Sequence, residues 1–520
     1  MRARTALAIG VLVVAQGATS AGPIGASVAD GPSGVDAAGT VGPPECGRDD
    51  RPETGIQGDI PLADQLSGRA RQGYNCGLAV VGHDPLGGRG ANANLAWSGT
   101  CAYVAGDGVA VVDVSDPADP EQVGTLTTPG AVDAFETVHA VDAGDRSILV
   151  AGRYGLFFDF QLASSAPVDV YDVSDCTNPK LLSTIQFPQS VHNVTLSPDG
   201  RTLWGTLPLQ AFDITEPAAP RYLGSLDQQL RAQGVQHLEY AHEAWPSDDG
   251  TRLYIGGQVP GDEVSMVVDI EGWPDRPPRV VSTFSGPGHS IRSATIDGRP
   301  YLLRSDESVV NLTANGCLPD LTPVGGAAQP FLTDLTDETA PVDRGRLTLD
   351  INDPTHCLDA LASGVNASSH YHDVDDPDDT TFAMVSMWNA GLRVFDVRDP
   401  DAPTEVAYFN PGMLGVPLVD LSGAPLDPGL NLQGQRDFDQ AWGHVRYVAE
   451  TGHLWVATRT GGFWVLELEP QVRAFLGLPA LPARSPNGGP PRPRGSPAVA
   501  GPPALDPTGS PTFYCTLGRL

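Results

Sequence analysis

The sequence has almost no lysine and far fewer basic than acidic residues. Among its 520 residues Lys180 is the single lysine, and 31 Lys and Arg stand against 63 Asp and Glu, for a formal net charge of −32. Affinity for nucleic acid and for anionic membranes depends on Lys and Arg that neutralise phosphates. The composition therefore excludes nucleic acid as the main partner and argues against binding to an anionic membrane surface.

Long apolar runs are also lacking beyond the N-terminus, so we expect no membrane span, which needs about 20 apolar residues. The N-terminus has a basic start, an apolar run from Ala6 to Ala15 and small residues up to Ser20. This order is typical of a secretory signal peptide. We therefore expect residues 1–20 to be a signal peptide and the protein to be secreted.

Several motifs of well-known enzyme classes are missing. The sequence has no Gly-x-Ser-x-Gly elbow, Walker loop, dinucleotide fingerprint or His-Glu-x-x-His. The sequence therefore gives no motif support for a serine hydrolase, a nucleotide-dependent enzyme or a zincin. No Cys-x-x-Cys pair occurs either, which argues against a thiolate zinc site or thioredoxin-like chemistry.

Seven cysteines are present, a number that suits an oxidising compartment with up to three disulfides and one thiol left over. Cys317 and Cys357 bracket one irregular insertion, so we expect these two to pair. The connectivity of the others stays open. They are Cys46, Cys76, Cys101, Cys176 and Cys515.

Glycine and proline are abundant, with 60 and 48 residues, and indicate a chain with many turns, while 41% hydrophobic residues are enough for a large core. The main signal is an internal repeat, in which a strand-like run ends in Asp and leads into a Pro-containing turn. Six copies and a degenerate seventh, which has Glu467 in place of the Asp, lie at residues 109–124, 168–183, 209–224, 265–282, 330–345, 392–407 and 463–477.

Two further strand-like runs precede each copy. Residues 192–206 and 242–257, for example, alternate apolar residues around Ser-Pro-Asp-Gly and Ser-Asp-Asp-Gly, which is a strong hairpin signal. Four antiparallel strands per repeat predict an all-β fold, a seven-bladed β-propeller. The blades are expected at about 91–126, 138–186, 191–226, 241–284, 288–352, 369–409 and 443–470.

The seventh blade lacks a clear fourth strand of its own. The run that starts at Leu78 could supply it and close the ring, or the run that starts at Val472 could, and the sequence does not decide between them. The propeller is expected to span residues 73–478. Residues 21–72 are expected to be a flexible Gly/Ala/Pro-rich linker and residues 479–520 a disordered Pro/Gly-rich tail.

The pattern Gly-x-x-Val-x-Asp-Val-x-Asp-Pro-x-x-Pro is best kept at residues 108–120 and 391–403. It resembles the LVIVD-repeat family of β-propellers, over roughly residues 77–470. The opening of the propeller from Leu78 is similar to that of secreted members. The resemblance implies the fold and says little about activity, since fold does not fix function.

Six histidines share one repeat position, the start of the first strand of a blade, where the first blade has Ala93 instead. First strands line the central channel of a propeller, so these imidazoles would converge there. Imidazole binds copper and zinc, but bonds of about 2 Å prevent all six from reaching one ion, so two to four would be ligands. The six are His139, His192, His242, His289, His372 and His444.

Other polar residues near these positions could orient the ligands: His237, Glu243, His370 and Asp373. The alternative is a purely structural role, in which each histidine hydrogen-bonds a neighbouring blade. The recurring Asp residues are expected to cap local backbone N–H groups at the turns.

Two functions follow from this pattern. The first is an exported module that binds an extracellular or cell-surface protein or a small-molecule ligand, with copper or zinc in the channel. The second is a copper-dependent oxidoreductase, because a His-lined propeller is similar in architecture to the selenium-binding protein and methanethiol oxidase family. That family's His-His pattern with a nearby Cys is not found, since the His370-Tyr371-His372 segment has no cysteine beside it.

Overall fold

The computed structural model describes residues 43–154, 166–235, 241–257, 264–286, 288–307, 329–413 and 438–481. All of them belong to one compact unit. The expected signal peptide and nearly all of the expected C-terminal tail lie outside the described residues.

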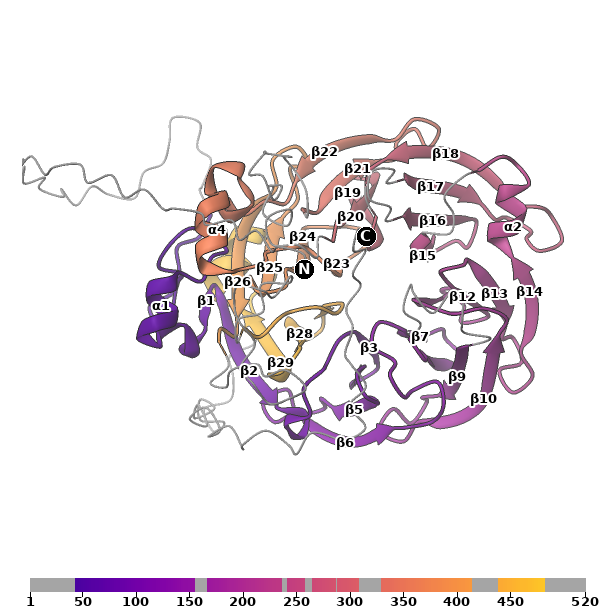
Figure 1. Cartoon of the computed structure of the whole chain (residues 1–520), viewed down its shortest axis with the longest axis horizontal. Helices are drawn as coiled ribbons and strands as arrows, with labels where there is room; N and C mark the ends of the chain where they lie inside the picture. The colour runs from indigo at the N-terminus through magenta and orange to yellow at the C-terminus, as the bar shows by residue number, and fades with distance from the viewer. Residues whose placement is uncertain are drawn as a thin grey trace, which may run out of the picture. The chain divides into compact units, whose positions relative to one another are not determined.

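The described strands form seven antiparallel sheets arranged in a ring (Figure 1), which confirms the seven-bladed β-propeller. In each blade the first strand lies toward the centre and the last at the rim. The first four blades comprise β3 (Leu95–Ser98), β4 (Cys101–Val104), β5 (Val109–Asp113) and β6 (Glu121–Leu126); β7 (Val138–Asp142), β8 (Ser147–Gly152), β9 (Ala166–Asp172) and β10 (Lys180–Phe187); β11 (Val194–Leu196), β12 (Thr202–Gly205), β13 (Gln210–Asp213) and β14 (Arg221–Ser225); and β15 (Ala241–Pro246), β16 (Arg252–Gly257), β17 (Val264–Asp269) and β18 (Arg279–Ser285).

The remaining three blades follow the same order, with one addition to the sixth and one substitution in the seventh. They comprise β19 (Ile291–Ile296), β20 (Arg299–Arg304), β21 (Phe331–Asp334) and β22 (Val342–Arg346); β23 (His372–Val374), β24 (Phe382–Ser386), β25 (Leu392–Asp396) and β26 (Thr404–Asn410), extended by β1 (Tyr74–Cys76); and β27 (Arg446–Val448), β28 (His453–Thr458) and β29 (Gly462–Leu468) with β2 (Leu78–Asp84).

Strand β2 closes the ring. It pairs antiparallel with β29, and Leu78 lies opposite Leu468 in the register. The alternative at Val472 is wrong, because Val472 lies in α5 (Pro470–Leu476), whose first position is the proline that favours a helix start. Pairing the N-terminal strand with the last blade leaves no open edge between the chain's two ends.

The hydrophobic core lies between neighbouring blades. Val111 of β5 and Leu149 of β8, for example, belong to one buried cluster. The middle strands are buried on both faces, as in β4, whose four residues are all buried. Their sequences are therefore nearly continuous apolar runs, while rim strands such as β6 alternate between exposed and half-buried residues.

The recurring Asp residues act locally, as expected. The carboxylate of each accepts a hydrogen bond from the backbone N–H two residues further on, as Asp113 does from Ser115 and Asp396 from Arg398. The same bond is made by Asp172, Asp213, Asp269 and Asp334.

The Pro-containing turns join one blade to the next. A Cβ on Gly82 of β2 would lie 2.2 Å from the carbonyl oxygen of Pro117, in the turn of the first blade. A Cβ on Gly345 of β22 would likewise lie 2.6 Å from the carbonyl oxygen of Pro400, in the turn of the sixth. Each turn thus packs directly on the rim strand of the preceding blade.

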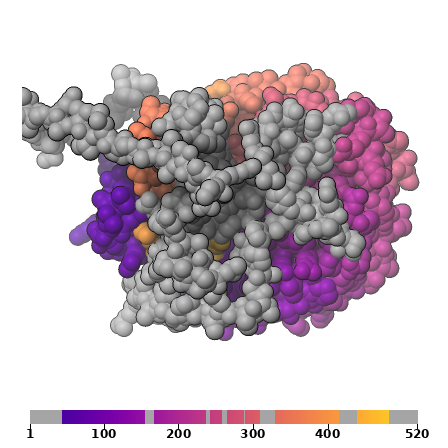
Figure 2. All heavy atoms as spheres, in the orientation of Figure 1, coloured from indigo at the N-terminus to yellow at the C-terminus, as the bar shows by residue number. Residues whose placement is uncertain are grey.

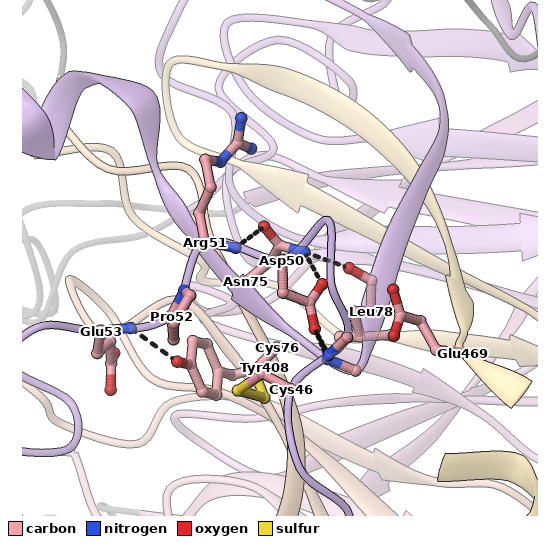
Figure 3. Close-up of a disulfide and its surroundings, with 12 residues drawn as sticks. Cys46, Asp50, Arg51, Pro52, Glu53, Asn75, Cys76, Leu78, Tyr408 and Glu469 are labelled. Carbon is pink, nitrogen blue, oxygen red and sulfur yellow. Dashed lines mark hydrogen bonds between the residues drawn. A yellow bond between two sulfur atoms is a disulfide. The ribbon is translucent and has the colours of Figure 1, made fainter. Parts of the chain in front are cut away.

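Residues 43–72 were expected to belong to a flexible linker, but they pack on the sixth blade. A disulfide joins Cys46 to Cys76 of β1, and the Asp50 carboxylate accepts hydrogen bonds from Gly77 N and Asn75 Nδ2 (Figure 3). Further along, the segment forms α1 (Leu62–Ser67). Composition concealed this order, because a few specific contacts rather than an apolar pattern hold the segment.

A buried ion pair fixes the same segment. The guanidinium of Arg393 in β25 contacts the carboxylates of Glu53 and Glu405, the latter at 3.1 Å. Burial alone would lower the pKa of Arg393, but these two carboxylates raise it above its ordinary value. Removing either partner would leave charge uncompensated in the core.

A second disulfide, Cys101–Cys176, joins the first two blades. Cys357 at the start of α4 (Cys357–Ser363) is also disulfide-bonded, while Cys317 and Cys515 lie outside the described residues.

Helix α1 lies beside α4, as the neighbouring indigo and orange atoms in Figure 2 show. Gln65 Nε2 of α1 donates a hydrogen bond to the carbonyl oxygen of Ser363 at the end of α4. No helix among the described ranges is long and apolar enough to cross a membrane.

Candidate metal centre

Four histidines and two glutamates form a buried cluster near the centre of the ring, and none is more than 6% exposed. Four of the six residues occupy the same place in their blades, two residues before the first strand. The first strands of successive blades lie side by side, so these residues converge. Two residues before such a strand stand Glu136, His192, His289 and His370. His242 lies in β15, and Glu307 follows β20.

The first half of the cluster is formed by His192, His242 and Glu136. The two Nε2 atoms are 2.8 Å apart, and they lie 3.6 Å and 3.7 Å from Glu136 Oε2. Ligand atoms on a tetrahedral ion with bonds of about 2 Å are spaced by about 3.3 Å. The two imidazoles are thus at hydrogen-bond distance, and all three atoms lie within 4.8 Å of one another, close enough to hold one ion.

The second half is formed by His289, His370 and the two glutamates. His370 Nε2 lies 3.7 Å from Glu136 Oε1 and 3.3 Å from Glu307 Oε1. His289 Nε2 lies 3.5 Å from Glu307 Oε2. Both glutamates thus face His370. Glu307 also faces His289, and Glu136 also faces His192 and His242.

Hydrogen bonds at the outer nitrogens set how two imidazoles face the cluster. His242 Nδ1 lies 2.9 Å from the carbonyl oxygen of His289, and His370 Nδ1 lies 2.8 Å from that of Trp442. A carbonyl can only accept, so each Nδ1 carries the hydrogen. In the neutral imidazole Nε2 is then the unprotonated atom that can bind a metal.

Some atoms that face the cluster are buried yet have no hydrogen-bond partner among the described residues. They are Glu136 Oε1, His370 Nε2 and both ring nitrogens of His289. A buried polar atom without a partner costs about 1–3 kcal/mol. Such a group of atoms needs a positive species between them, either a proton or a metal ion.

Burial and the neighbouring groups disfavour charge on His242, His289 and Glu136. Burial, followed by the neighbouring imidazoles, lowers the pKa of His242 and of His289 well below 6.5. Burial also raises the pKa of Glu136 to about 7. His370 differs, because its interaction with Glu307, followed by the charge of Glu136, overcomes the effect of burial and raises its pKa.

Tyr371 orients the carboxylate that joins the two halves. Its hydroxyl donates to Glu136 Oε2 at 3.0 Å and accepts from Asn193 Nδ2 at 2.8 Å. Both residues are buried. This relay holds Glu136 with one oxygen toward each half of the cluster.

The structure separates the six predicted histidines into two groups. His192, His242 and His289 lie in the cluster, whereas His139, His372 and His444 surround the buried Arg292. The Arg292 guanidinium is 2.7 Å from His444 Nε2.

The environment of Arg292 is electrostatically balanced. Its Nη1 lies 2.9 Å from Glu243 Oε2, and its guanidinium stacks 3.5 Å from the centre of the Trp245 ring. Burial and this cation lower the pKa of His139 and of His372 to about 3. A cation already present beside these imidazoles disfavours a second one.

Of the residues expected to orient the ligands, His370 instead faces the cluster directly. Glu243 pairs with Arg292, and Arg292 and His444 lower the pKa of Glu243 even though burial opposes this. Burial raises the pKa of Asp373 to about 6. His237 lies outside the described residues.

Sequence reasoning missed Glu136 and Glu307 because it followed histidine alone. In the second blade the histidine pattern selected His139, which lies inside β7, three residues beyond Glu136. Glu136 lies two residues before β7, the position that His370 occupies before β23, so the same position in the second blade was the signal for Glu136. Glu307 follows β20 and has no such repeat position.

Comparisons with known proteins agree with the repeat. The family model of the LVIVD repeat matches residues 89–128. No curated protein matches the sequence.

Three solved structures illustrate the similarity. A chain of a mitotic checkpoint complex has a TM-score of 0.43 at 12% identity, covering 74% of this chain and 90% of its own. The β-propeller domain of Cps50 (Swd1) from Myceliophteria thermophila has a TM-score of 0.42 at 12% identity, covering 72% and 96%. A Lactobacillus plantarum protein has a TM-score of 0.39 at 13% identity, covering 61% and 87%. By its sheet topology and its match to the family model, the chain is a seven-bladed β-propeller repeat protein that carries an LVIVD repeat in its first blade.

Proposed function

We propose that this protein is an exported metal-binding β-propeller, whose central histidines and glutamates hold a transition metal. The observation that carries the proposal is the convergence of buried ligand atoms of Glu136, His289 and His370, which all lie within 4.8 Å of one another. Imidazole with carboxylate is a donor set suited to zinc, copper or iron. The ring of blades provides rigid support for such a set.

Export is supported by the disulfides. Disulfides persist in oxidising compartments and are rare in the cytosol. The predicted signal peptide points the same way. We expect the metal-loaded propeller to act outside the cell on a protein or small-molecule partner.

Elemental analysis of the purified, untagged chain tests the metal. We expect at least one zinc or copper ion per chain, and loss of metal from the double variant His242→Ala/His289→Ala. The matched control His139→Ala/His444→Ala removes two buried histidines from the Arg292 group and should retain the metal. A wild-type chain that stays metal-free after zinc and copper are added contradicts the proposal.

A copper-dependent oxidoreductase is the second candidate. Tyr371 favours it, because this buried phenol bonds Glu136 and packs 4.8 Å from the His370 ring, centre to centre. A tyrosine so close to a metal could supply an electron during oxidation. Oxygen consumption by the copper-loaded chain with a small thiol would support this activity, and copper-loaded chain without consumption would leave a binding role.

A further inference from the structure

We infer that the cluster holds two metal ions bridged by the Glu136 carboxylate; this inference rests on the proposed function. Two groups of three ligand atoms have all their members within 4.8 Å of one another, namely Glu136–His192–His242 and Glu136–His289–His370. Glu136 is their common member. A shared carboxylate is the usual link between two ions about 3.5–4 Å apart.

The distances favour two ions over one. Opposite ligands of a single ion with bonds of about 2.1 Å lie no more than about 4.2 Å apart. If all four histidines and Glu136 bound one ion, their ligand atoms would form a single group within 4.8 Å. In the described part of the chain they form two groups instead.

The orientation of Glu136 fits a bridge. Its Oε2 faces His192 and His242 at 3.6 Å and 3.7 Å, while its Oε1 faces His370 at 3.7 Å. Each oxygen is thus directed to a different half of the cluster. The hydroxyl of Tyr371, which donates to Oε2, fixes the carboxylate in this direction.

Glu307 lies beside the second position. Its Oε1 and Oε2 lie 3.3 Å and 3.5 Å from the Nε2 atoms of His370 and His289. The group of ligand atoms within 4.8 Å that defines this position contains Glu136, His289 and His370. Each ion would therefore have two imidazoles and the shared carboxylate, and Glu307 would face both imidazoles of the second ion.

Zinc stoichiometry tests the bridge. The metal-free full-length chain is dialysed against Zn²⁺ alone, and bound zinc is measured by elemental analysis. We expect two ions per chain in the wild type and one in either His192→Ala/His242→Ala or His289→Ala/His370→Ala. The control His139→Ala/His444→Ala should retain two.

The outcomes distinguish the two proposals. One zinc per wild-type chain that both double variants abolish overturns the bridge and leaves the metal site, whereas no zinc at all overturns the proposed function as well. Because an alanine variant can fail to fold, a second measurement uses the wild type alone. In the Cu²⁺-loaded chain, coupling between bridged ions should leave a paramagnetic resonance signal below the copper content, and a signal equal to the copper content contradicts the bridge.

Discussion

At the scale of single residues, two buried polar groups near the centre of the ring differ in what balances their charge. Glu243 pairs with the Arg292 guanidinium. Glu136 forms ion pairs with imidazoles alone among the described residues. The Arg292 group therefore contains its own cation, whereas we propose that a metal ion supplies the positive charge in the Glu136 group.

The Arg292 group should make stability depend on pH. Burial and Arg292 lower the pKa of His444 to about 4, against about 6.5 in the unfolded chain. Below pH 6.5 the unfolded state binds the additional proton, so the free energy of unfolding falls as the pH drops toward 4, by about 1.4 kcal/mol per pH unit.

The variant His444→Gln should lack this contribution. Denaturant unfolding of the metal-free wild type and variant at pH 7, 6, 5 and 4 measures the difference in their free energies of unfolding. We expect the difference to shrink least between pH 7 and 6 and by more per pH unit between pH 6 and 4. A difference independent of pH would mean that His444 is not held neutral by Arg292.

At the scale of elements, the closing strand β2 determines whether the ring is sealed. Leu78 and Val80 lie on this strand two residues apart, but Leu78 is fully buried between the sixth and seventh blades while Val80 is 39% exposed. Comparing substitutions at these two positions therefore distinguishes the contribution of core packing by β2 from a general effect of changing this strand.

Truncation of these two side chains should have unequal effects. Leu78→Ala should lower the free energy of unfolding by about 3 kcal/mol, as a cavity in a core does. Val80→Ala, the matched control on the same strand, should lower it by less than about 1 kcal/mol. Equal effects in denaturant unfolding would show that β2 does not seal the core.

The elements were largely predictable because each blade repeats one pattern. The Asp residues and their Pro-containing turns mark the end of the third strand, and the Asp-Gly turns mark the first hairpin. The closure stayed open because Leu78 and Val472 both begin apolar runs. Only the proline that starts α5 and the pairing of β2 with β29 separate them.

At the scale of the whole molecule, the ring brings together residues that lie far apart in the sequence. Tyr371 bonds Glu136 across a separation of 235 residues. The sequence could predict convergence of the first strands, and it named His192, His242 and His289. It could not predict that Arg292 would lie near His139, His372 and His444 and lower their pKa values, because that depends on which side chains of neighbouring strands meet.

The order of the N-terminal segment is another property of the assembled ring. The disulfide from Cys46 to Cys76 of β1 and the contact of Glu53 with Arg393 both require the sixth blade to be formed, because β1 pairs with β26 and Arg393 lies in β25. Residues 43–72 therefore read as a linker when taken alone.

Anomalous diffraction from crystals of the zinc-loaded protein, recorded on either side of the zinc absorption edge, tests the central claim most directly. The account predicts density about 2 Å from the Nε2 atoms of His192 and His242, with a second peak at His289 and His370. Absence of density at all four histidines, or density only beside His139, His372 and His444, would contradict it.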